Sequence, residues 1–100
     1  MSKILTIIAR IEAKVDKVEF VKAELLKLVA PTIKEEGCIQ YDLHQDNDNP
    51  AVFIFFEQWE SAEHLKQHAS NTHIVAYKKA TEGAIESSTI YKMTRISAVG

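Results

Sequence analysis

The chain has 100 residues, of which 46% are hydrophobic and 26% charged, with a formal net charge of −2. This length predicts a single domain over residues 1–100, with enough apolar side chains for one core. Because acidic and basic residues are balanced and interleaved, the sequence indicates neither a nucleic-acid-binding protein nor one that binds anionic membranes.

Cys38 is the only cysteine, which excludes an intrachain disulfide and fits a reducing compartment. No apolar run is long enough for a membrane span, and the opening residues do not resemble a signal peptide. We therefore expect a cytoplasmic protein.

A strand and an amphipathic helix are the first elements expected along the chain. Residues 4–13 are rich in β-branched side chains that alternate in direction. Asp16 and Glu19 then resemble a capping box, and apolar residues recur after them at steps of three and four. Pro31 should kink or end this helix near Val29, since proline has no amide hydrogen.

Two strands joined by a turn are expected next. Residues 38–45 alternate between apolar and polar side chains, and residues 46–50 are rich in turn-forming residues. Residues 52–56 are apolar without alternation, so both faces of this strand need cover. Glu57 and Trp59 follow, and their spacing places both side chains on one face.

Helices and a last strand complete the chain. Ser61 is a plausible N-cap for a short helix over residues 62–69. A residue among 70–72 can cap a further helix that runs through Lys79. The last strand is expected over residues 85–96.

The order strand, helix, strand, strand, helix, helix, strand is typical of a split βαβ arrangement. It predicts a ferredoxin-like α+β sandwich with a four-stranded antiparallel sheet. The helices can cover only one face of that sheet, yet residues 4–13 and 52–56 are apolar on both faces. A bare apolar face of this size is rare in monomers, and at about 25 cal/mol per Å² its burial is worth many kcal/mol. We therefore expect a homodimer in which two sheets pack face to face.

Several motifs lie between Glu35 and His73. They are Glu36-Gly37-Cys38, Tyr41-Asp42-Leu43-His44-Gln45-Asp46, Phe53, Glu57-x-Trp59-x-Ser61, His68 and His73. Together with the strand order, they resemble the antibiotic biosynthesis monooxygenase family, especially its small quinol-monooxygenase-like members. The resemblance implies a dimeric α+β barrel with a pocket between helices and sheet in each subunit. It also implies oxidation of quinol- or anthrone-like aromatics by dioxygen with no metal, flavin or other cofactor.

Some members of this family degrade haem with an Asn in the first strand, a Trp at the position of Trp59 and an axial His on the next helix. Here Ala9 and Arg10 lie near the Asn position. Tyr77 falls about where the axial His would be. The resemblance therefore disfavours haem degradation.

The candidate substrate-binding residues are Trp59, Glu57, Phe55 and Tyr77. Trp59 is either a core or interface aromatic, or a flat wall on which a planar substrate stacks. A carboxylate such as Glu57 beside an apolar run must be paired, hydrogen-bonded or shifted in its pKa. A structural role, in which Glu57 accepts bonds from loop amides or an Arg, is favoured over a functional role.

The candidate catalytic residues are His68 and His73, with His44 in reserve. His68 and His73 can each serve as a proton acceptor at a pocket mouth, although hydrogen bonding at helix ends explains them equally well. His64 and His68 have the i, i+4 spacing of a zinc pair but lack the accompanying glutamate of zincins. We therefore predict no metal site.

The leading hypothesis is a cofactor-independent monooxygenase acting on a small quinol- or anthrone-like aromatic with dioxygen. A histidine would remove a phenolic or enol proton in a dry pocket, and the anion would react with dioxygen. The alternatives are a non-catalytic small-molecule-binding or stress-related dimer, and an isomerase acting on a polar metabolite. Aromatic walls with one reachable histidine support the oxygenase, several Lys or Arg favour an anionic ligand, and a filled cavity favours a structural role.

Overall fold

The computed structural model describes residues 4–97, so residues 1–3 and 98–100 of the predicted domain lie outside the described residues. One antiparallel sheet has the strand order β2-β3-β1-β4. Its strands are β1 (Leu5–Ala13), β2 (Cys38–Gln45), β3 (Val52–Trp59) and β4 (Ile85–Met93). The predicted ferredoxin-like α+β fold is confirmed.

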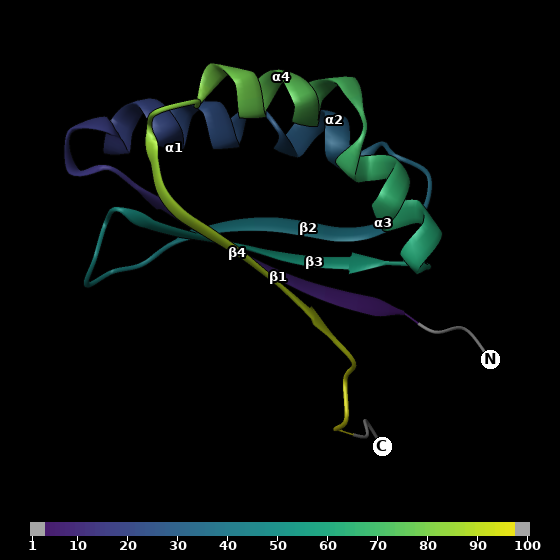
Figure 1. Cartoon of the computed structure of the whole chain (residues 1–100). Helices are drawn as coiled ribbons and strands as arrows, with labels where there is room; N and C mark the ends of the chain where they lie inside the picture. Colours follow the sequence, from purple (N-terminus) through teal and green to yellow (C-terminus); the bar gives the residue numbers. More distant parts are fainter. Residues whose placement is uncertain (1–3, 98–100) are drawn as a thin grey trace.

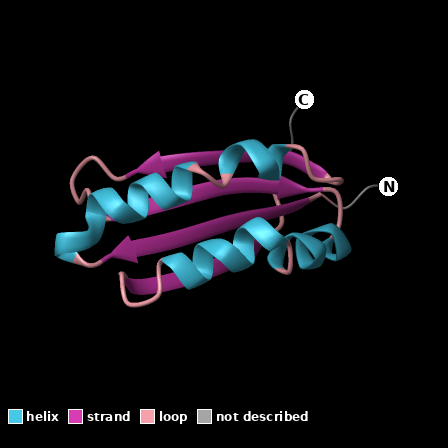
Figure 2. Cartoon of the chain, turned by 90° about the horizontal axis from the view of Figure 1, so that it is seen from above, coloured by secondary structure: helices cyan, strands magenta, loops and turns pink. Residues whose placement is uncertain are grey.

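All the helices lie on one face of this sheet (Figure 1), in rows that run along the strands (Figure 2). They are the 3₁₀ turn η1 (Val15–Lys17), α1 (Val18–Leu26), α2 (Val29–Ile33), α3 (Ala62–Ala69) and α4 (Thr72–Ala80). None of the helices within residues 4–97 is long and apolar enough to cross a membrane.

The helix caps differ between the two halves of the chain. The predicted N-cap Ser61 is confirmed, since its side chain accepts from the backbone N–H of His64. Asn71 caps α4, with its side chain accepting from the backbone N–H of the next residue, Thr72. The predicted capping box at Asp16 is wrong, because Asp16 lies inside η1 and α1 begins without a side-chain cap.

The break in the first helix comes earlier than predicted. Helix α1 ends at Leu26, and the new helix α2 begins at Val29. Pro31 therefore lies in the first turn of α2, where its missing amide hydrogen leaves no bond unmade.

Two strands end at positions other than those predicted. Strand β3 continues through Glu57 to Trp59, because both residues pair with β1. Strand β4 ends at Met93, opposite Thr6 of β1, and does not reach Ile96.

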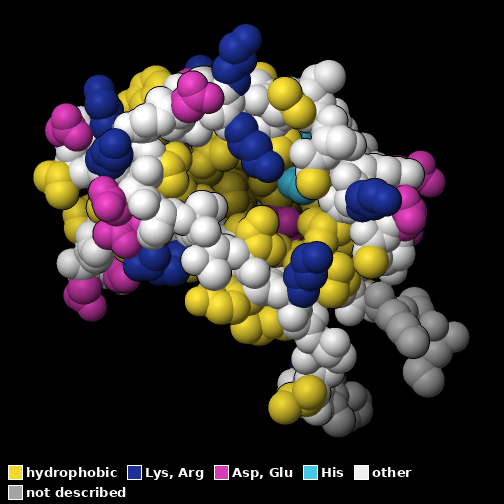
Figure 3. All heavy atoms as spheres, viewed as in Figure 1, with side chains coloured by type: hydrophobic (Ala, Val, Ile, Leu, Met, Phe, Trp, Pro, Cys, Tyr) yellow, Lys and Arg dark blue, Asp and Glu magenta, His cyan; other side chains and the backbone are white. Residues whose placement is uncertain are grey.

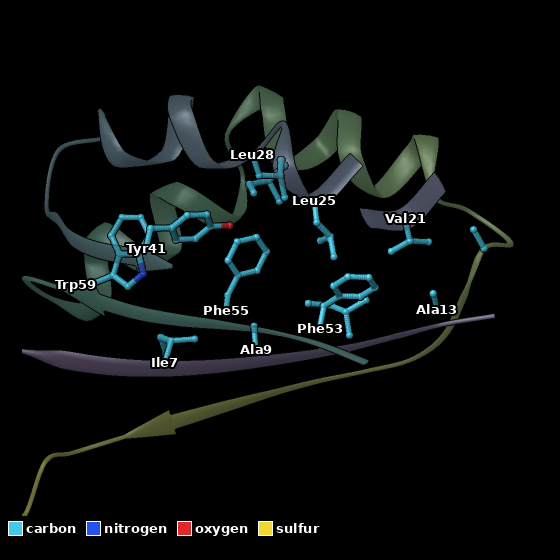
Figure 4. Packing of buried hydrophobic residues seen from close by; sticks show 13 residues of the cluster. Ile7, Ala9, Ala13, Val21, Leu25, Leu28, Tyr41, Phe53, Phe55 and Trp59 are labelled. Carbon is cyan, nitrogen blue, oxygen red and sulfur yellow. The ribbon is translucent and has the colours of Figure 1, made fainter. Parts of the chain in front are cut away.

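The register divides the sheet into two chemically distinct faces. Ile7 lies opposite Glu57 and Ala9 opposite Phe55 on the face covered by the helices. The core packs there, with the side chains of β1 and β3 pointing towards α1 (Figure 4). Ile8 lies opposite Phe56 on the other face, which no helix of residues 4–97 covers. The two-sided apolar character predicted for the sheet is therefore present.

Candidate functional site

A cavity of about 580 Å³ lies between the helices and the sheet. Its walls come from all four strands and from α1, α3 and α4 as well as the α1–α2 connection, and they are mainly aliphatic and aromatic. Tyr41 and Phe55 stack with their ring centroids 4.4 Å apart and provide an aromatic surface. Figure 3 shows the hydrophobic side chains that line this hollow. The volume suits a small ligand.

His68 presents one ring nitrogen to a carboxylate and leaves the other free. It lies in the last turn of α3 and lines the cavity. Its Nδ1 atom is 2.8 Å from Oε2 of Glu35, which lies in the turn between α2 and β2. Because a carboxylate only accepts, Nδ1 carries the hydrogen and the Nε2 lone pair is available. Within residues 4–97, Nε2 has no hydrogen-bond partner, so the cavity holds an accessible proton acceptor.

His73 binds the same carboxylate oxygen. Its Nε2 atom lies 2.7 Å from Oε2 of Glu35 and 3.1 Å from Oγ1 of Thr32. His73 does not line the cavity. It acts through Glu35, whose side chain is 10% exposed and bound to both imidazoles.

Glu35, His68 and His73 also form a cluster with metal-ligating potential, because their ligand atoms lie within 4.8 Å of one another. In the hydrogen-bonded arrangement, N–H groups of both histidines point at the carboxylate. A metal ion would have to replace those two protons.

The buried ionisable groups have shifted pKa values. Burial lowers the pKa of His68, an effect that the Glu35 hydrogen bond and charge partly offset, so the ring is neutral at pH 7. Burial raises the pKa of Glu57 to about 7, although the Trp59 hydrogen bond opposes the shift. The cavity therefore contains a neutral base and a carboxyl group poised between its two protonation states.

The structure does not place Trp59 on the cavity surface. The indole is fully buried and does not line the cavity. Its Nε1–H donates to Oε1 of Glu57 at 2.9 Å, and its ring lies 4.7 Å from that of His68. It therefore contacts Glu57 and His68 from behind the cavity wall, and the aromatic rings that do line the cavity are those of Tyr41, Phe55 and Tyr77.

The remaining predicted residues divide between the two faces of the sheet. Phe55, Glu57 and Tyr77 line the cavity with His68. His44 is exposed and pairs with Ile54, so it lies on the face away from the helices and is not brought to the other histidines.

Sequence reasoning missed Glu35, Tyr41 and the lysines of the cavity lining. Alternation along residues 38–45 already placed Tyr41 on the apolar face, so this residue could have been found. Glu35 gave no such signal, because an acidic residue in a turn is usually solvated.

Comparisons with known proteins agree with this architecture. The family model described as antibiotic biosynthesis monooxygenase matches residues 4–80. The Escherichia coli K12 protein named "Probable quinol monooxygenase YgiN" is 32% identical over 91 residues, which cover 81% of this chain and 88% of that protein. The structure of PA3566 from Pseudomonas aeruginosa matches with a TM-score of 0.93 and 36% identity, covering 97% of this chain and 98% of that one.

A more distant relative shares the fold. Rv0793 from Mycobacterium tuberculosis has a TM-score of 0.87 at 22% identity and covers 97% of this chain and 99% of its own. The family model spans most of the sequence, and the E. coli relative is similar along most of its length. The chain therefore belongs to the antibiotic biosynthesis monooxygenase family.

Proposed function

We propose that the protein is a cofactor-independent monooxygenase that oxidises a small quinol- or anthrone-like aromatic with dioxygen. One observation carries the proposal: Nε2 of His68 is free in an apolar cavity while Nδ1 is held by the buried Glu35 carboxylate. Membership of the family supports a monooxygenase-like activity. The name of the E. coli relative supports a quinol as the substrate class.

In the first step, Nε2 of His68 removes a proton from a phenolic or enolic hydroxyl group of the substrate. The negative charge of Glu35 stabilises the imidazolium that forms, and it fixes the ring orientation through Nδ1. The stacked rings of Tyr41 and Phe55 hold the planar anion beside the base.

In the second step, the electron-rich anion transfers an electron to dioxygen, and the two radicals combine to a peroxide. The peroxide-bearing carbon then loses its C–H proton, the electron pair of that bond forms C=O as the O–O bond breaks, and the departing hydroxide takes up a proton and leaves as water. The protonated form of Glu57, whose pKa lies at about 7, can supply a proton to the departing oxygen. The apolar walls keep out water that would otherwise quench the anion.

Oxygen consumption with a panel of naphthoquinols and anthrones tests the proposal. We expect His68→Gln to lower kcat by about 10²–10⁴-fold, the usual contribution of a general base. His44→Gln is the matched control and should leave kcat unchanged, because His44 lies on the other face. Treatment with EDTA should not change the wild-type rate.

Two outcomes would contradict this function. One is no oxygen uptake with any quinol or anthrone of the panel, and the other is an unchanged rate in His68→Gln. Conversion of a substrate without oxygen uptake would support the isomerase alternative.

The homodimer is part of the same proposal. The bare face of the sheet carries a second hollow of about 340 Å³ with Ile8, Phe56 and Met93 in its lining. Packing two such faces together would bury these apolar side chains.

A cytoplasmic location, expected from the single cysteine, also belongs to the proposal.

A further inference from the structure

Lysines from three different elements line the cavity. Lys66 of α3, Lys78 of α4 and Lys92 of β4 all contribute to its lining. All three residues are exposed, and within residues 4–97 none of them forms an ion pair. Figure 3 shows dark-blue Lys or Arg side chains at the edge of the hydrophobic hollow. We call these three residues the lysine rim.

Few negative charges balance the lysine rim. Among the described lining residues, Glu57 is the one carboxylic acid, and it is buried and bonded to Trp59. With its pKa raised to about 7, Glu57 is only partly ionised at neutral pH. The cavity therefore combines a positively charged mouth with an apolar interior.

One lysine of the rim acts electrostatically on His68, the proposed base. Lys78 lies close enough to His68 for its ammonium charge to contribute to lowering the pKa of that histidine. A fixed charge acts more strongly beside low-dielectric walls than in open water. Lys78 therefore lies near the position that a ligand hydroxyl group bound to His68 would occupy.

Resting on the proposed function, we propose that the substrate is a planar hydroxyaromatic that carries an anionic group, a carboxylate or a phosphate. The ring lies against Tyr41 and Phe55, and the anionic group lies among the lysine rim at the mouth. A neutral quinol would use the apolar walls and the base but would leave three unpaired cations beside it. An anionic substituent matches both the charge and the polarity of the site.

The proposal is tested by calorimetric binding of three probes that cannot react as quinols. Naphthalene-2-carboxylate and 2-naphthyl phosphate carry the anion, and naphthalene-2-carboxamide is the neutral match. We expect the anions to bind about tenfold or more tightly than the carboxamide at low salt, and the preference to shrink as salt screens the lysines. Retention of the preference with only one of the two anions would identify which group the rim accepts.

Variants assign the preference to the rim. Each of Lys66→Gln, Lys78→Gln and Lys92→Gln should weaken binding of the anions about three- to tenfold and leave carboxamide binding unchanged. The triple variant should bind all three probes alike. Lys79→Gln is the matched control, because Lys79 is an exposed neighbour on α4 that does not line the cavity.

The outcomes separate this inference from the proposed oxygenase function. Equal binding of the carboxamide and the anions, no binding of any probe, or a preference that survives in the triple variant would overturn the role of the rim. If the carboxamide and the anions bind equally but a neutral quinol supports oxygen uptake, the proposed oxygenase function stands and only the role of the lysine rim is lost. If the anions bind more tightly than the carboxamide but no quinol supports oxygen uptake, the proposed oxygenase function is refuted and the role of the lysine rim stands.

Discussion

The position of a single proton decides what His68 can do. Glu35 accepts from Nδ1 at 2.8 Å, so the lone pair of Nε2 remains available as an acceptor. His73 occupies the same carboxylate oxygen at 2.7 Å and limits its movement. Glu35 is therefore a positioning residue, although it does not line the cavity itself.

Replacing Glu35 with Gln should change the pH profile as well as the rate. The carboxylate raises the pKa of His68 against the larger effect of burial, so its loss lowers that pKa further. The acidic limb of kcat/KM should move to lower pH, because His68 stays neutral to lower pH. The weaker base should lower kcat about tenfold or more. Steady-state rates between pH 4.5 and 8 measure both effects.

The neighbouring Glu36→Gln is the control for this prediction, since Glu36 is exposed. A purely structural role of Glu35 would lower the rate without moving the acidic limb. That result would remove Glu35 from the proposed mechanism.

At the scale of elements, the connection into β2 depends on Gly37. Its backbone has a φ of +86°, in the left-handed region that favours glycine. A Cβ atom there would lie 2.2 Å from Cγ of His64 in α3. The carbonyl of Gly37 also accepts from the backbone N–H of Glu60 at 2.8 Å. This close approach fixes the start of α3, and with it the position of His68.

Gly37→Ala should therefore destabilise the protein by about 2–4 kcal/mol, through backbone strain and overpacking together. Gly83→Ala is the matched control, because Gly83 has a φ of +81° with nothing within 4 Å of the added Cβ. Gly83→Ala should lower the free energy of unfolding by only about 1 kcal/mol, through the backbone strain alone. Urea unfolding followed by circular dichroism measures both changes. Equal losses in the two variants would show that contact with His64 does not matter.

Elements with local signals could be predicted from the sequence, and those that depend on tertiary contacts could not. Alternation over residues 38–45 and the cap at Ser61 gave β2 and α3 with their observed bounds. The Asp16 pattern failed because the chain forms a 3₁₀ turn before the helix. The pairing of Glu35 with His68 joins residues 33 positions apart, which no local pattern encodes.

Strand parity carried more information about the site than residue type did. The same alternation that placed Tyr41 towards the helices placed His44 away from them. Trp59 has the correct parity, but alternation does not reveal that its indole lies beneath the cavity wall. How deeply a side chain is buried depends on the packing of α3 over the sheet, and alternation along one strand does not encode that packing.

At the scale of the whole molecule, one face of the sheet is apolar and bare. Packing within residues 4–97 does not explain why apolar side chains lie there. Ile8, Ile54 and Phe56 are half-buried there although no helix covers them. Tyr91 and Met93 of β4 are each 46% exposed. Such a contiguous apolar surface is expected at a protein interface.

Sedimentation at micromolar concentration should therefore give about twice the chain mass of 11.3 kDa. Phe56→Glu should reduce the mass to that of one chain, because a carboxylate would be buried without a partner in the interface. Val75→Glu is the control, since Val75 is 55% exposed on α4 and far from that face. A wild-type monomer at this concentration would refute the sheet-to-sheet dimer.

The alternating register of β3 links the cavity to the bare face. Glu57 points to the cavity, whereas its neighbours Phe56 and Gln58 point to the opposite side. Deletion of one residue early in this strand would slip the register and exchange the two sets of side chains. A carboxyl group would then enter the proposed subunit contact and a phenyl ring would enter the cavity. A single in-frame deletion should therefore abolish the proposed assembly and the proposed turnover together.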